Sequence, residues 1–124
     1  MDANIALLTP TPPLHAPTLR LDLISVLDDL RRDQPWRVRG HNARTLAKYP
    51  DLRVVLVAMQ PQSRLHEHRT AARITIQVLT GRLRVRIEGQ DVELSSGELF
   101  VIDRSLPHEV EAIEESAFLL TLSW

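Results

Sequence analysis

Apolar and polar positions alternate in short segments over most of the chain after residue 40. The clearest alternation is in residues 82–87, where aliphatic side chains alternate with arginines, so that a strand would present one apolar and one charged face. Residues 52–59 instead form a nearly continuous run rich in valine, which suits a buried strand. The segments predicted as strands are 43–48, 52–59, a segment containing His66 and His68, 74–79, 82–87, 91–94, 98–102, 108–113 and 117–123.

Turn residues separate these segments at intervals of about ten residues. Tyr49-Pro50-Asp51, Thr80-Gly81, Gly89-Gln90 and Ser95-Ser96-Gly97 are the breaks between strands. Eight or more short strands with such spacing predict an all-β fold, an antiparallel sandwich or barrel.

The N-terminal region has a different pattern. Four prolines between residues 10 and 17 exclude a helix or a central strand there, because proline lacks the amide donor and fixes φ. We therefore expect an extended arm over residues 1–17 and a single domain over 18–124. Residues 19–23 alternate and predict a short edge strand.

A short helix is expected after this strand. Ser25 with Asp28 three positions later resembles a capping box, and Val26, Leu27 and Leu30 would face the core. The helix is predicted to end near Arg32, because the residue before a proline disfavours the α region. From Trp36 onward the pattern predicts strands.

Composition narrows the function classes. The net charge of −1 argues against a general nucleic-acid binder, which would carry a basic face. No apolar run approaches the roughly 20 residues of a membrane span, and the N-terminus lacks the pattern of a secretory signal, so a cytoplasmic protein is expected. The chain has no cysteine, so a metal could be held only by imidazole or oxygen.

Three of the five histidines lie in two predicted strands. His66 and His68 are two residues apart, which on a regular strand places both on one face. His108 lies in a later strand that could fold back beside the first. These three residues are a candidate metal site, whereas Glu67 between them would face solvent.

The histidine segments carry two motifs that resemble those of the cupin superfamily. In that family the first motif is a glycine, five intervening residues, His-x-His, three or four intervening residues, a glutamate, six intervening residues and a second glycine. The second motif begins with a glycine and reaches a histidine eleven residues later, as Gly97 and His108 do here. The resemblance covers residues 52–123 and implies a jelly-roll barrel.

The first motif fits in two registers. If His66 and His68 are the paired histidines, the distance to Gly81 is one residue too long. If His68 is the first histidine, every spacing fits, and Gln62 replaces the first glycine, Thr70 the second histidine and Ile74 the glutamate. Spacing favours this second register, in which His66 could stand in for the lost ligand. In the second motif Asp103, Ser105 and Ala112 replace a proline, a glycine and an asparagine.

The resemblance leaves two functions open. One is a metal-dependent enzyme of dioxygenase type, with iron, nickel, zinc or manganese on His66, His68 and His108. The other is a metal-free binding or sensor module whose pocket includes Thr70, Ile74 and Ile76. In both cases the partner is a small molecule, and neither a nucleic acid nor a membrane is expected as a partner. The proline-rich arm suggests arm exchange or edge-strand pairing in a homodimer, as many small members of the family form.

The arginines of residues 82–87 have a simpler explanation than substrate steering. Outward side chains on a sheet usually meet carboxylates across the strands, and Glu109, Glu111, Glu114 and Glu115 are available. We therefore expect ion pairs on the outer face of the sheet.

Overall fold

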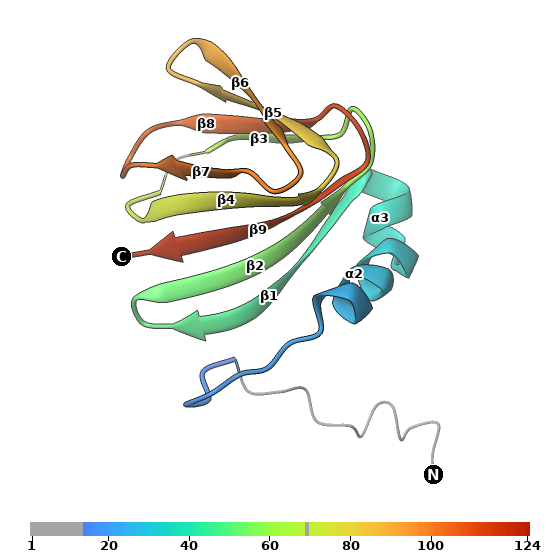
Figure 1. Ribbon diagram of the computed structural model, residues 1–124, viewed down its shortest axis with the longest axis vertical. Helices are drawn as coiled ribbons and strands as arrows, with labels where there is room; N and C mark the ends of the chain where they lie inside the picture. The colour runs from blue at the N-terminus through green and yellow to red at the C-terminus, as the bar shows by residue number, and fades with distance from the viewer. Residues whose placement is uncertain (1–13, 69) are drawn as a thin grey trace.

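Two antiparallel sheets face each other and form a barrel (Figure 1). The computed structural model describes residues 14–68 and 70–124, without the side chains of Glu67 and His68. The first sheet has the order β1 (His41–Tyr49), β2 (Leu52–Met59), β9 (Ser116–Ser123), β4 (Arg73–Thr80) and β7 (Leu99–Ile102). The second has the order β3 (Arg64–His68), β8 (His108–Ala112), β5 (Arg82–Ile87) and β6 (Gln90–Ser95). The predicted all-β barrel is confirmed.

The main core fills the space between the two sheets. Alternation along β4, β5 and β8 turns every second side chain inward, as the pattern of β5 predicts. Leu83 and Val85 are fully buried, while the arginines between them face outward. The inner cluster is formed by Val57, Met59, Ile74, Ile76, Val78, Leu83, Val85, Leu94, Ile102, Val110, Ala112 and Phe118.

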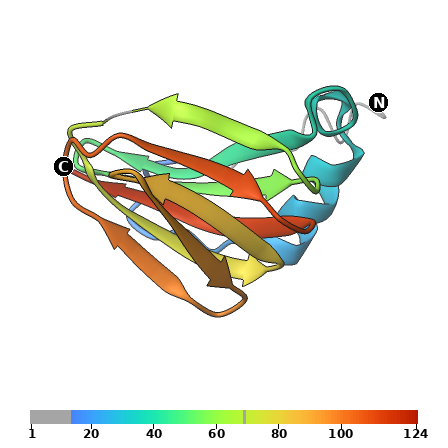
Figure 2. The ribbon, with the colours of Figure 1, turned by 90° about the horizontal axis from the view of Figure 1, so that it is seen from above.

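A second core lies on the outer side of the larger sheet. Helices α2 (Leu23–Arg32) and α3 (Gln34–Arg39) pack against β1 and β2, and Figure 2 shows them gathered at one end of the barrel. Leu30 and Trp36 from the helices bury themselves against Leu46, Leu56 and Ala58 of the sheet. The residues predicted to face the core from α2 do so, since Val26 and Leu27 also pack on this cluster.

The N-terminal predictions need three corrections. Residues 19–22 form no strand, because the Asp22 carboxylate accepts hydrogen bonds from the amides of Ile24 and Ser25 and thereby starts α2. Asp22, rather than Ser25, is therefore the N-cap. The predicted start of β structure at Trp36 is also wrong, because Pro35 lies in the first turn of α3, where its missing amide costs no hydrogen bond.

The predicted arm lies mostly outside the described residues. The part that is described lies along β1: the amide of Lys48 donates to the carbonyl of Leu14 over 2.7 Å, and the Tyr49 hydroxyl donates to the carbonyl of Ala16. No helix in the described part of the chain is long and apolar enough to span a membrane.

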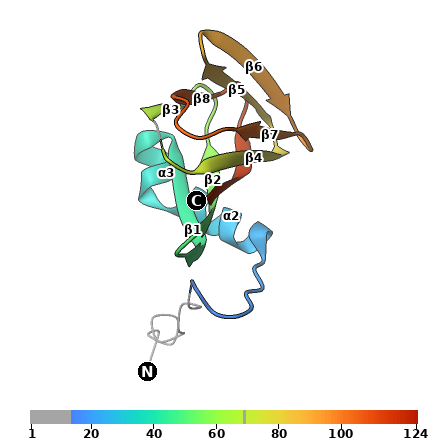
Figure 3. The same ribbon diagram turned by 90° about the vertical axis from the view of Figure 1, so that its left-hand side faces the viewer.

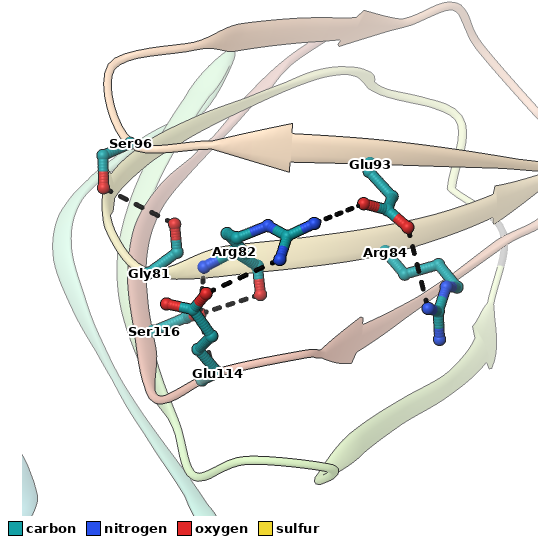
Figure 4. A network of polar contacts seen from close by, with 7 residues as sticks. All are labelled: Gly81, Arg82, Arg84, Glu93, Ser96, Glu114 and Ser116. Carbon is teal, nitrogen blue, oxygen red and sulfur yellow. Dashed lines mark hydrogen bonds and ion pairs between the residues drawn. The ribbon is translucent and has the colours of Figure 1, made fainter.

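The outward arginines of β5 form the predicted ion pairs (Figure 4). Arg82 bridges to Glu93 and Glu114, and Arg84 bridges to Glu93 and Glu111. Arg86 pairs with Asp91 of β6. Two of the expected partners pair elsewhere: Glu115 with Arg31 of α2 and Glu109 with Arg64 of β3.

Candidate ligand site at one end of the barrel

The pairing of β3 with β8 brings two of the predicted histidines together. His68 occupies the ladder position opposite His108, at the end of the barrel near the C-terminus (Figure 1). The register shifts between Leu65 and His68, because three steps along β3 correspond to two along β8. This bulge places His68, and not Glu67, opposite the inward-facing residue of β8.

His108 is a buried polar residue with a defined orientation. Its side chain is 2 % exposed and lies on the inner face of β8. Its Nδ1 atom lies 3.0 Å from the carbonyl oxygen of Leu106. Since a carbonyl only accepts, Nδ1 carries the proton in this bond, and the neutral ring then has its lone pair on Nε2. The same arrangement orients histidines that bind metals through the other ring nitrogen.

Backbone conformation discriminates between the two registers of the first motif. A motif glycine typically marks a position that needs positive φ. In the second register the four glycine positions of both motifs are Gln62, Gly81, Gly97 and Ser105, and their φ angles are 67°, 88°, 87° and 63°. The first register would use Gln60, which is not among the residues with positive φ. The structure therefore favours His68 as the first histidine of the motif.

His66 has different surroundings from His108. Its side chain is exposed, next to the bulge in β3. The pKa of His41, at the start of β1, is lowered by burial, by the charge of Arg39 and also by the charge of His66. His66 therefore interacts electrostatically with His41 of β1. Among the residues whose side chains are described, no three His, Cys, Asp or Glu groups could hold a metal ion together.

Two of the three predicted pocket residues are apolar and fully buried. Ile74 and Ile76 are at most 1 % exposed and belong to the inner core. Ile74 stands at the glutamate position of the second register, so that hydrocarbon replaces a carboxylate there. Thr70, at the position of the second histidine, is half-buried, and its Oγ1 accepts a hydrogen bond from the amide of Ala72.

Two loops are tied together at this end of the barrel. The amide of Ser105 donates to the carbonyl of Thr70 over 2.9 Å, and the Arg73 guanidinium pairs with the Asp103 carboxylate at 3.1 Å. The amide of Arg104 and then the side chain of Arg73 donate hydrogen bonds to Asp103 and lower its pKa. Sequence analysis missed this tie, although Asp103 and Ser105 are two of the positions that depart from the family motif.

A charged groove lies on the opposite face of β8. It has a volume of about 400 Å³ and is lined by Arg64, Arg84, Arg86, Asp91, Glu109 and Glu111. These side chains belong to the ion-pair network of the outer face. The groove is therefore separate from the inward-facing His108.

Comparison with solved structures shows the same fold in proteins of different kinds. KdgF from Halomonas sp. is 27 % identical, with a TM-score of 0.64 over 68 % of this chain and 80 % of its own. A conserved protein of unknown function from Streptococcus pyogenes is 19 % identical, with a TM-score of 0.71 over 90 % of this chain and 91 % of its own. Salicylate 1,2-dioxygenase from Pseudoaminobacter salicylatoxidans, in a structure with gentisate adducts, is 15 % identical. Its TM-score is 0.79 over 91 % of this chain and 35 % of its own.

The sequence comparison is consistent with the fold. No curated protein matches the chain. The family model of the cupin domain matches residues 55–123, which include the strands that carry His68 and His108. By this match over more than half of its length, the chain belongs to the cupin family.

Proposed function

We propose that this cupin binds a small molecule at the end of the barrel where β3 meets β8. The observation that carries the proposal is the buried, inward-facing imidazole of His108, oriented by the carbonyl of Leu106. A few oriented polar groups among apolar walls are typical of small-molecule sites. His68, opposite His108 in the ladder, would be the second polar group, and Ile74 would supply part of the wall.

A divalent transition metal is the first candidate for what organises this site. The hydrogen bond from Nδ1 of His108 to a backbone carbonyl supports it, because such bonds orient metal-binding imidazoles. His68 and His108 would hold the metal, with His66 as the third ligand only if its exposed side chain turned toward them. Iron, nickel and zinc accept imidazole ligands, whereas manganese prefers carboxylates. A bound metal would supply Lewis-acid or oxygen chemistry of the kind used by dioxygenases.

A metal-free binding module is the second candidate. Ile74 supports it, because the family glutamate is replaced by a side chain that cannot bind a metal. In that case His68 and His108 would hydrogen-bond an organic ligand directly. Cytoplasmic localisation and the homodimer stay predictions under either candidate.

Metal content tests the first candidate. We expect protein purified without a tag or chelator, and incubated with Fe²⁺, Ni²⁺ or Zn²⁺, to retain near one equivalent of metal by elemental analysis. His108→Ala and His68→Ala should abolish retention, whereas His15→Ala, on an exposed residue of the arm, should not. His66→Ala decides whether His66 is a ligand. No retention by the unmodified protein would leave the metal-free module as the proposal.

Ligand binding tests the proposal as a whole. The probes are small aromatic and aliphatic carboxylates, beginning with gentisate, and the measurement is the melting temperature with and without each probe. We expect at least one probe to raise the melting temperature of the unmodified protein but not that of His108→Gln. If neither a metal nor any probe shifts the melting temperature, the proposed site is wrong.

A further inference from the structure

The two sheets leave four edge strands in the described part of the chain. These are β1 and β7 in the larger sheet and β3 and β6 in the smaller one. An edge strand exposes unpaired amides and carbonyls, which invite pairing with another strand. Proteins usually protect such edges with charged side chains, bulges or covering segments. The four edges differ in whether they have this protection.

Three of the edges are protected. β1 exposes Arg44 and Lys48, and the amide of Lys48 is already paired with Leu14. β3 contains the bulge before His68 and exposes Arg64. β6 has Asp91 and Glu93 on its outer side. Charge or irregular geometry therefore opposes the addition of a strand at each of these edges.

β7 lacks such protection. Its two outward side chains, Leu99 and Val101, are 60 % and 55 % exposed, and the strand Leu99–Ile102 contains no charged residue. Their neighbours on β4 are Gln77 and Thr75, which are also uncharged. Figure 3 shows β7 away from α3, so that the helix layer does not cover it. This edge is therefore uncharged and partly apolar, as an edge that accepts another strand should be.

We propose that β7 pairs with β7 of a second copy of this chain, in antiparallel orientation across a twofold axis. The charges that flank the strand favour this occupant: Glu98 precedes β7, and Asp103 and Arg104 follow it. The Asp103 carboxylate is already paired with Arg73, so the net charge at that end of the strand is positive. Antiparallel pairing brings each Glu98 to the end of the interface where the partner's Arg104 lies, whereas parallel pairing would bring like charges together. The same patch on both copies is then self-complementary, as a twofold interface requires.

The pairing would join the two larger sheets and bury Leu99 and Val101 from both copies. It does not use the N-terminal arm, which meets the opposite edge of the sheet at β1. Nor does it depend on the ligand site proposed above, because β7 contributes only its outer side and its edge.

Sedimentation velocity of the full chain tests the interface. We expect a dimer for the unmodified protein at about 100 µM, and a dissociation constant at least about tenfold higher for Leu99→Lys combined with Val101→Lys. The matched control is Ile24→Lys combined with Val38→Lys, since these side chains are 76 % and 72 % exposed on the helices. The control should dimerise like the unmodified protein. Circular dichroism verifies that both variants are folded.

Charge reversal gives a second test that does not alter the apolar residues. Arg104→Glu should weaken the dimer, and the addition of Glu98→Arg should restore it, because the attraction between the flanking charges is re-formed with opposite signs. Three outcomes would overturn the proposal: an unmodified protein that is monomeric, a dimer unaffected by the lysine pair in β7, or a dimer lost only when residues 1–13 are deleted.

Discussion

Asp22 shows how one exposed side chain determines where an element begins. Its Oδ1 accepts hydrogen bonds from the amides of Ile24 and Ser25 at 3.1 and 3.2 Å, and its Oδ2 accepts one from the Ser25 hydroxyl. The hydrogen bond from the Ser25 amide and then that from its side chain lower the pKa of Asp22 below its usual value. The charged form of Asp22 is therefore the form that stabilises α2.

The pH dependence of this cap has a definite sign. A carboxyl whose pKa is lower in the folded state stabilises the fold above its unfolded pKa, near 3.8, and this stabilisation is lost as the pH falls through the folded pKa. We expect Asp22→Ala to lower the melting temperature by a few degrees at pH 7 and by less near pH 3. Asp28→Ala, on an exposed residue of the same helix, is the control. A deficit of Asp22→Ala that stays constant down to pH 3 would contradict this account.

At the scale of elements, the turn from β4 into β5 is held by a single buried serine. The Oγ of Ser116 accepts from the amide of Arg82 and lies within hydrogen-bond distance of the carbonyls of Arg82 and Glu114, at 3.1 and 2.8 Å (Figure 4). Gly81 fits beside it because it has no side chain. A Cβ there would lie 2.3 Å from the carbonyl of Glu115 and from the Ser116 Oγ.

Gly81 and Gly97 allow the cost of positive φ to be measured separately from the cost of steric clash with a new side chain. Gly81 and Gly97 have φ of 88° and 87°, but a Cβ at Gly97 would meet no atom within 4 Å. We expect Gly97→Ala to cost about 1 kcal/mol, the cost of positive φ alone, and Gly81→Ala to cost roughly 2–4 kcal/mol. Urea unfolding measures both values. Equal costs would show that the β4–β5 turn can move to accommodate a methyl group.

Local patterns determined which elements could be predicted. The strands over residues 52–59 and 82–87 are predicted with their observed bounds. A strand that is buried on both faces is almost continuously apolar, as in 52–59, whereas a strand that is buried on one face alternates between apolar and polar residues, as in 82–87. Helix α3 was missed because Pro35 was interpreted as a stop, although it lies in the first turn of a helix. The strand predicted over 19–23 is absent, because the Asp22 side chain caps helix α2 there, although apolar and polar residues alternate in this segment.

The candidate site was less predictable for a related reason. Strict alternation placed His66 and His68 on one face, but a bulge, which alternation does not reveal, changes the register before His68. The pairing of β3 with β8 depends on contacts between residues about forty positions apart, and only the family spacing from Gly97 to His108 indicated it. The tie between Arg73 and Asp103 had no sequence signal of its own.

The whole molecule is organised around the larger sheet, which has an apolar cluster on each face. The inner cluster includes Val57 and Phe118, and the outer one includes Leu56 and Ala58 from the same strand as Val57. Because adjacent residues of β2 belong to different clusters, loss of one cluster removes the support of the other. The helix layer and the barrel should therefore unfold as one unit, as the single domain predicted over residues 18–124 requires.

Two probes can test this cooperativity in one experiment. Trp36 is buried in the outer cluster, with the Arg31 guanidinium 5.8 Å from its ring centre, so its fluorescence reports on the helix layer. Far-UV circular dichroism reports mainly on the strands. In a Trp124→Phe background, which removes the only other tryptophan, we expect the two urea transitions to coincide.

Leu30→Ala should lower the free energy of unfolding measured by both probes by the same amount, about 2–5 kcal/mol. Val38→Ala, on an exposed side chain of α3, should change neither value. If Leu30→Ala moves the fluorescence transition alone, the helix layer unfolds independently and the barrel is stable without it.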